Sequence, residues 1–235
     1  MIPQGRFCEI IAEDIENTQN NNFYAIDSLQ DERSGKWDKQ VLKYAVMKST
    51  ADISQLSLLK RAVNVTMTMW DIETELKLVP STDNPEIRIY FKSSIEEPYF
   101  AEHPATLAFA YYPAQGNASG IIVINDDYYW NLTGGEVEAY LVDPVHYTKG
   151  DGKMIRGYNL IAVLGHEFGH TLGLTHSVEL ESDDLMRPYY DPNVRWISLN
   201  DIARMLLKYP ISIGGIWYNS RMRAWVRRRI LRFMF

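Results

Sequence analysis

The sequence predicts an α+β domain in which about three helices pack against a twisted, mixed sheet of five strands. Segments with alternating apolar residues and many β-branched side chains are typical of strands, and they recur between residues 41 and 124. Apolar residues at helical spacing occur once after the first of these segments and twice after the last. The resulting order of one strand, one helix, four strands and two helices favours a single sheet with helices packed on it.

The strands are expected at residues 41–47, at Leu76 or Leu78, and at residues 86–91, 107–111 and 120–124. A first helix is expected over residues 54–70, with Ser54 as a candidate N-cap. A second helix is expected over residues 159–172. A third is expected over residues 199–207, and it ends near Pro210 because proline cannot continue a helix.

Two segments flank this domain, which we expect to span residues 37–210. Residues 1–36 are polar and are expected to form a short element followed by a loop or flexible arm. Residues 211–235 form a basic, aromatic tail, and residues 212–235 contain six arginines and no acidic residue. Such a tail either contacts an anionic membrane surface or a partner, or packs as a terminal helix on the acidic body of the domain.

Composition narrows the classes of function. The formal net charge of −6 gives no reason to expect nucleic acid as the main partner. No stretch approaches the roughly 20 apolar residues of a membrane-spanning helix. The first residues carry no apolar segment, so no signal peptide is expected. Cys8 is the only cysteine, which excludes an intramolecular disulfide.

The most informative segment is residues 166–176, which reads HEFGHTLGLTH. His166 and His170 are four residues apart and therefore lie on one face of a helix. Gly173 can adopt a positive φ and end that helix, so that His176 turns back as a third ligand. Three histidines leave one position of a tetrahedral zinc ion open for water, which is typical of a catalytic site.

Glu167 follows the first histidine and points away from it, so it can reach a zinc-bound water without being a ligand itself. Zinc lowers the pKa of such a water to about 7 and polarises a carbonyl group. Glu167 would take the proton of the water and pass it to the leaving amine. The pattern therefore predicts one catalytic Zn²⁺ and a hydrolytic reaction.

Residues 185–190, Leu-Met-Arg-Pro-Tyr-Tyr, complete a two-part pattern with the histidine motif. They resemble the Met-turn of the matrixins, the matrix metalloproteinase family of metzincin zinc peptidases. The resemblance covers most of residues 37–209 and implies a metzincin-like fold and a zinc metalloendopeptidase. It implies that Met186 lies beneath the zinc as an apolar floor. It also implies that Pro188 and Tyr190 line the pocket for the substrate side chain after the scissile bond.

The resemblance also implies where a substrate binds. Residues 107–113, LAFAYYP, resemble the family's edge strand above the active-site cleft. An extended protein or peptide substrate would add to this edge as a further strand, through backbone hydrogen bonds. We therefore expect Leu107 and Ala108 to contact the substrate.

Three departures from the family pattern matter. Phe109 and Val123 stand where the family has two histidines of a second, structural zinc site, so we expect no structural zinc. Residues 125–127, Asn-Asp-Asp, offer oxygen ligands for Ca²⁺, but a solvated acidic turn is the favoured interpretation. Cys8 lies upstream of the first strand, as the family's latency cysteine does. Most of the surrounding family motif is missing, so a plain unpaired cysteine is favoured over a switch.

Two functions from different classes follow. The first is a zinc endopeptidase that cuts extended protein substrates. The alternative is a membrane- or partner-binding module that keeps the peptidase fold with little activity, and residues 212–235 motivate it. Family resemblance implies an extracellular protein, whereas the expected lack of a signal peptide leaves the compartment open.

Overall fold

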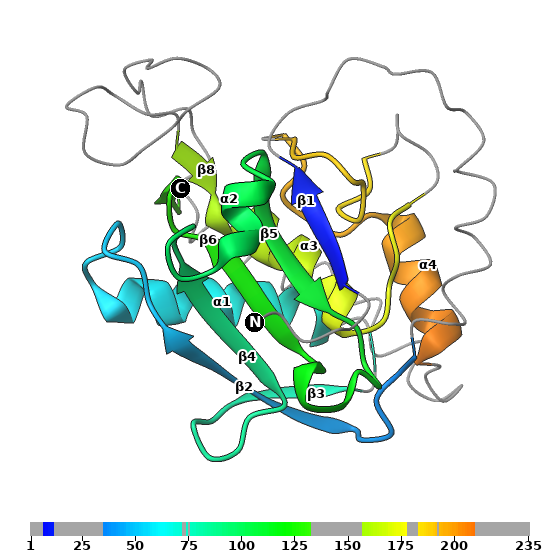
Figure 1. The fold of residues 1–235 in the computed structure, drawn as a ribbon. Coiled ribbons are helices and arrows are strands. Elements are labelled where there is room, and N and C mark those ends of the chain that lie inside the picture. The colour runs from blue at the N-terminus through cyan, green and yellow to red at the C-terminus, as the bar shows by residue number, and fades with distance from the viewer. Residues whose placement is uncertain are drawn as a thin grey trace.

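A computed structural model describes residues 7–11, 35–71, 74, 76–132, 157–177, 183–191 and 193–209, with the backbone alone described for residues 7–11. The basic tail, His146 and residues 178–182 lie outside the described residues. In the described part of the chain, no helix is both long and apolar enough to cross a membrane. The described elements form the α+β arrangement that the sequence predicts (Figure 1).

The main sheet has the strand order β1-β5-β6-β4-β2-β3 (Figure 1). The five predicted strands are present as β2 (Val41–Lys48), β3 (Lys77–Pro80), β4 (Ile87–Lys92), β5 (Thr106–Tyr111) and β6 (Ile121–Asn125). Strands β3, β2, β4 and β6 run parallel, whereas β5 pairs antiparallel with β6, so the sheet is mixed. The sixth strand, β1 (Phe7–Ile11), pairs antiparallel with β5.

The position of β1 corrects one expectation. The family resemblance implies that residues 107–111 form an edge of the sheet, but β1 pairs along this strand from Phe7 opposite Tyr111 to Ile11 opposite Thr106. Residues 7–11 read Phe-Cys-Glu-Ile-Ile, a composition with high β-propensity. Local patterns cannot reveal a pairing between segments that are so far apart in the chain.

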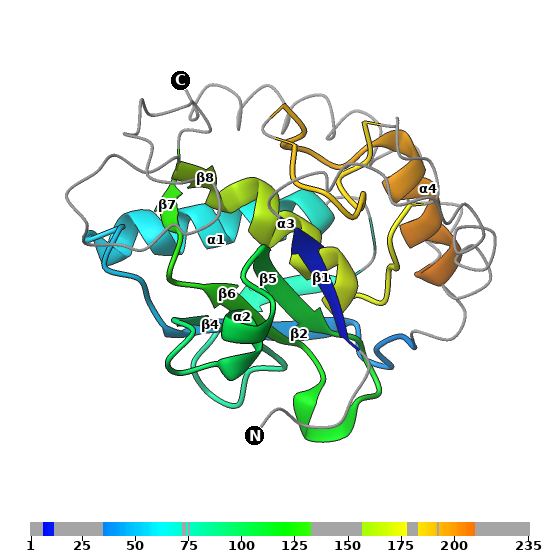
Figure 2. The same cartoon turned by 45° about the horizontal axis from the view of Figure 1, so that its top comes forward.

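Two long helices cover one face of the sheet (Figures 1 and 2). They are α1 (Leu56–Asp71) and α3 (Leu160–Thr171), and they pack against each other. The first carbonyl acceptor of α1 belongs to Gln55, so Gln55 and not Ser54 precedes the helix. The last helix, α4 (Leu199–Lys208), begins with a capping box in which the side chain of Ser198 accepts from the N–H of Asp201.

Four short elements have no counterpart in the sequence prediction. They are α2 (Pro98–Glu102), the 3-10 turn η2 (Gly116–Ala118), β7 (Tyr129–Asn131) and β8 (Gly157–Asn159). Strands β7 and β8 pair in parallel just before α3 begins. Elements of three to five residues are too short to show a helical or strand period.

The core consists of two apolar clusters on opposite faces of the sheet. The main cluster lies between the sheet and the helices α1 and α3, and it includes Trp70, Ile124 and Phe168. The second cluster is formed by Phe100 of α2 together with Phe109, Tyr111, Ala118 and Val123. Residues 108–111 of β5 and 122–124 of β6 alternate between the two clusters, because successive side chains of a strand point to opposite faces.

Candidate metal centre

The histidine motif lies on α3, as the sequence predicts. The side chain of Asn159 caps this helix by accepting hydrogen bonds from the N–H groups of Ile161 at 3.0 Å and Ala162 at 3.4 Å. All 12 residues of α3 are buried. The helix ends at Thr171, and Gly173 has a φ of +95°, in a place where a side chain would overlap with the carbonyl of Gly35. The chain therefore turns at Gly173, as predicted.

Two side chains from distant parts of the chain hold the end of α3. The indole N–H of Trp37 donates to the carbonyl of Thr171 at 2.7 Å, and the hydroxyl of Tyr209 donates to the carbonyl of Leu172 at 3.0 Å. The backbone N–H of Trp37 donates in turn to the Tyr209 oxygen at 3.0 Å. The last carbonyls of a helix have no partner within it. These bonds satisfy them and fix the direction in which the chain leaves α3.

The three predicted ligands meet at one point. His166, His170 and His176 each offer a ring nitrogen, and these atoms lie within 4.8 Å of one another. The Nε2 atoms of His166 and His170 are 2.9 Å apart. His166 and His170 are fully buried, whereas His176 is partly exposed. The predicted convergence of these three histidines is confirmed.

Hydrogen bonds determine which ring nitrogen of the two histidines on α3 faces the centre. Nδ1 of His166 lies 2.7 Å from the carbonyl oxygen of Leu185, and Nδ1 of His170 lies 2.6 Å from that of Leu174. A carbonyl oxygen only accepts, so both Nδ1 atoms carry the proton and both Nε2 atoms present lone pairs. Two lone pairs at 2.9 Å repel each other unless they share a cation. The donor set therefore fits a metal ion.

Burial keeps both imidazoles of α3 neutral. It lowers the pKa of His166 to about 4, although the hydrogen bond to Leu185 opposes this shift. Burial, and then the neighbouring His166 and His176, hold the pKa of His170 well below its usual value. A histidine must be unprotonated to bind zinc, so both rings are ready as ligands at neutral pH.

The Met-turn packs directly on α3. The side chain of Met186 is fully buried, and its carbonyl accepts a hydrogen bond from the N–H of Ser177 at 2.8 Å. Gly169 leaves the space for this contact, because a methyl group there would overlap with the sulfur of Met186 and press on Trp70. The sequence analysis missed the role of Gly169. The signal was a glycine inside a buried helix, where it costs about 0.5–1 kcal/mol relative to alanine.

Helix α4 positions the first ligand through the Met-turn. One carboxylate oxygen of Asp201 accepts hydrogen bonds from the N–H groups of Leu185 at 2.8 Å and Ser198 at 2.9 Å. The carbonyl of Leu185 faces His166, so Asp201 acts on this ligand through a single residue. Burial raises the pKa of Asp201. Asp184, also buried, accepts from the Ser198 hydroxyl and from Nδ2 of Asn200, the latter at 2.7 Å.

Arg204 of α4 holds the third ligand. Its guanidinium donates to the carbonyl and the hydroxyl of Thr175 at 2.9 Å and 3.0 Å, and to the carbonyl of His176 at 3.4 Å. These bonds fix the backbone that carries His176. The sequence analysis missed both Arg204 and Asp201, because their partners lie 28 and 16 residues away and no local pattern connects them.

The predicted general base and the predicted substrate strand lie close to this centre. Glu167 is fully buried on α3 beside His166. Leu107 and Ala108 are fully buried on β5, which packs against α3. The ring of Tyr112, just after β5, meets the ring of His170 edge-on at a centroid distance of 5.6 Å. Strand β5 therefore runs alongside the ligands.

Residues of the Met-turn border a small pocket. Tyr190 lines it together with Ala162 of α3 and the segment around Leu185, whereas Pro188 does not belong to its lining. The hydroxyl of Tyr190 accepts a hydrogen bond from the N–H of Asn159 at 3.1 Å. Its position is thus fixed against the first turn of α3, while Pro188 is partly buried next to it.

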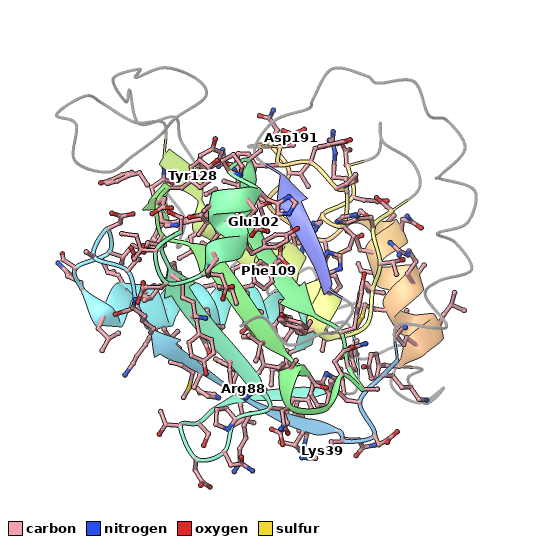
Figure 3. The ribbon with its side chains drawn as sticks, in the orientation of Figure 1. Lys39, Arg88, Glu102, Phe109, Tyr128 and Asp191 are labelled. Atoms are coloured by element: carbon pink, nitrogen blue, oxygen red, sulfur yellow. The ribbon has the colours of Figure 1, made fainter. Side chains whose placement is uncertain are left out.

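Two residues that stand where the family has histidines of a second zinc site, Phe109 and Val123, belong to the apolar core. Phe109, which is labelled in Figure 3, and Val123 lie in the second cluster. The ring of Phe109 packs on that of Phe100 at a centroid distance of 5.4 Å. The acidic turn uses side-chain oxygens within the fold. Asn125 accepts from the N–H of Asp127 at 3.1 Å, and the Asp127 carboxylate accepts from the N–H of Ser94 at 2.9 Å.

Comparison with known proteins agrees with this geometry. A profile of the matrixin family matches residues 36–206. The chain belongs to the matrixin family. Karilysin of Tannerella forsythia is 28% identical to this matrixin over 191 residues, which cover 78% of this chain and 35% of karilysin. Human matrix metalloproteinase-20 is 30% identical over 158 residues, which cover 66% of this chain and 28% of the relative.

Human matrix metalloproteinase-26 is 26% identical over 177 residues, which cover 72% of this chain and 58% of that protein. This matrixin therefore spans less than two thirds of the length of each of the three relatives. Matrixins use a catalytic zinc ion, and His166, His170 and His176 are positioned to bind it. The predicted family, fold class and metal are thus confirmed.

Proposed function

We propose that this matrixin is a zinc-dependent endopeptidase that hydrolyses peptide bonds in extended protein substrates. The observation that carries the proposal is the convergence of three imidazoles beside the buried Glu167. Membership of the matrixin family supports the same class of reaction. When bound, zinc supplies Lewis acidity at the substrate carbonyl and lowers the pKa of water.

Residues of the chain itself carry out the proton transfer and hold the metal. Glu167 accepts the proton of the attacking water and transfers it to the nitrogen of the leaving amine. His166 and His170 would hold the metal through Nε2, because the carbonyls of Leu185 and Leu174 orient their rings, and His176 would be the third ligand. Three ligands leave a fourth position of the ion to water or substrate.

Substrate recognition involves strand β5 and the small pocket at the Met-turn. The extended substrate backbone pairs with β5 at Leu107 and Ala108, which lie alongside α3. The pocket lined by Tyr190 and Ala162 takes the substrate side chain after the scissile bond. Family membership also leads us to propose that the enzyme works outside the cell.

A substitution at the general base tests the reaction. Glu167→Ala is expected to retain one zinc per chain and to cleave labelled casein at least about a hundredfold more slowly. Glu167→Gln should behave alike, because the amide has a similar size but cannot accept the proton. Glu102→Ala, at an exposed site on α2, is the matched control and should cleave like the wild type. Undiminished cleavage by Glu167→Ala, or less than about half an equivalent of zinc, contradicts the proposal.

A further inference from the structure

The small pocket at the Met-turn contains an ion pair in its wall. The guanidinium of Arg187 donates from Nη1 to the carboxylate of Asp191 at 3.0 Å, and both residues line the pocket. Their side chains are only 19% and 26% exposed, so the pair is largely shielded from water. The rest of the lining is aliphatic or aromatic and comes from Ala162, Leu185, Tyr189, Tyr190 and Val194. A charged group therefore borders a pocket whose other walls are mostly apolar.

The ion pair is held in place by the chain around it. The second carboxylate oxygen of Asp191, which is labelled in Figure 3, accepts a hydrogen bond from the N–H of Asn193 at 2.8 Å. The carbonyl of Asp191 accepts from the N–H of Val194 at 3.1 Å. The ring of Tyr190 packs edge-on against that of Tyr158 at a centroid distance of 5.2 Å. The wall that carries Arg187 is thus fixed before a substrate arrives.

Arg187 has a hydrogen-bond donor left over. Its Nε is buried and has no acceptor among the described residues. A guanidinium only donates, so an oxygen acceptor is the partner that this group needs. The free space in the pocket is about 10 Å³, roughly enough for one water molecule. A substrate side chain that fills this space excludes water from the pocket and must supply the acceptor itself.

We propose that Arg187 is a specificity-determining residue that selects substrates with an oxygen acceptor on the side chain after the scissile bond. The inference rests on the proposed function, because it assumes that this side chain enters the pocket. Asparagine and leucine give the sharpest comparison, since their side chains have nearly the same shape and only asparagine carries an acceptor. Its amide oxygen accepts from Arg187, and the carboxylate of Asp191 has lone pairs left for its N–H groups. Leucine would leave the buried donor unpaired, and a site that hydrogen-bonds a substrate group rejects the analogue without it.

A pair of peptides tests this preference in the full-length enzyme. Both are built around a bond that the enzyme cuts in casein, and they differ only in asparagine or leucine after that bond. We expect kcat/KM to be about tenfold higher for the asparagine peptide, because an unsatisfied buried donor costs at least that factor. Equal values, or a preference for leucine, overturn the inference without any variant.

A substitution assigns the preference to the guanidinium. Arg187→Met keeps a long stem and removes every donor, so it should prefer the leucine peptide. The matched control is Arg61→Met, at an exposed site on α1, and it should keep the ratio of the wild type. A preference for asparagine that survives in Arg187→Met contradicts the inference. A ratio that is lost equally in Arg61→Met also contradicts it, because the effect would not come from the pocket.

A binding experiment gives a readout that needs no peptidase activity. Zinc-loaded Glu167→Ala is titrated with both peptides, with and without Arg187→Met. The asparagine peptide should bind about tenfold more tightly when Arg187 is present, and this advantage should disappear with Arg187→Met. Equal affinities for the two peptides when Arg187 is present overturn the inference even where the enzyme is active. If casein is not cut at all, the proposed function fails, and peptides of a generic extended sequence with the same exchange still show whether Arg187 selects an acceptor.

Discussion

Helix α3 and the chain that follows Gly173 supply ligands to the same centre, yet they are held by different interactions. Every residue of α3 is buried against α1 and the sheet, so apolar packing positions His166 and His170. Residues 174–177 and 183–191 contain no helix. Hydrogen bonds that the Asp201 carboxylate accepts and the Arg204 guanidinium donates set their backbone instead.

The difference suggests how stability and function are divided in this matrixin. Deleting a packed side chain costs more free energy than losing a hydrogen bond, because packing energies of large core residues exceed the net energy of most hydrogen bonds. A defect in α3 should therefore lower the stability of the whole domain. A defect in the segment after Gly173 should disturb the metal centre and leave most of the fold intact.

The largest effect is expected in the buried core. Phe168→Ala removes a fully buried ring on α3 and should lower the free energy of unfolding by about 3–5 kcal/mol. Urea denaturation followed by circular dichroism measures this change. Leu207→Ala on α4 is the control, because Leu207 is 86% exposed and should change stability by less than about 0.5 kcal/mol. Similar losses for both variants would contradict the packing argument.

A smaller effect is expected at the support of the Met-turn. Asp201→Ala leaves the N–H of Leu185 without its acceptor and breaks the capping box of α4, at a cost of about 2–3 kcal/mol. Zinc affinity should fall about tenfold or more, because Leu185 orients His166. Asp201→Asn keeps an acceptor oxygen and avoids a buried charge, so it should lose less in both measurements. Equal losses for the two variants would show that the hydrogen bonds do not matter.

Removal of zinc should separate the two regions directly. After treatment with a chelator, we expect amides of residues 174–177 and 183–191 to exchange hydrogen about tenfold faster, which corresponds to about 1.4 kcal/mol. Amides of α3 should change little, because burial in the core protects them with or without metal. Hydrogen exchange with mass spectrometry measures both. Equal acceleration in α3 would mean that the metal, and not the core, holds this helix.

The smallest effect is expected at the third ligand. Arg204→Met keeps an apolar stem of similar length but removes the donors to Thr175 and His176, so stability should fall by about 1 kcal/mol. Zinc affinity, measured by competition with a coloured chelator, should fall about tenfold because His176 is less well oriented. Arg204→Lys keeps one charged donor and should lie between the two. Unchanged zinc affinity in Arg204→Met would exclude a positioning role.

Local patterns were sufficient for the strands of the central sheet and for the zinc helix. The alternation in residues 86–91 and the glycine at position 173 report on conformations that depend on neighbouring residues alone. Gly169, Asp201 and Arg204 act through contacts with distant residues, so the same reasoning did not find them. Strand β1 was missed for the same reason. It pairs with β5 and occupies the edge at which a substrate was expected to pair.

The sequence by itself determined which histidines meet at the centre, because the spacing of His166 and His170 along one helix is a local property and Gly173 permits the turn to His176. Only the tertiary structure decided which residues support the metal centre and which strand pairs with the outer side of β5. Those outcomes depend on which distant segments meet, and the free energy of such contacts is set by burial and hydrogen bonding across the whole fold and not by any single stretch of chain.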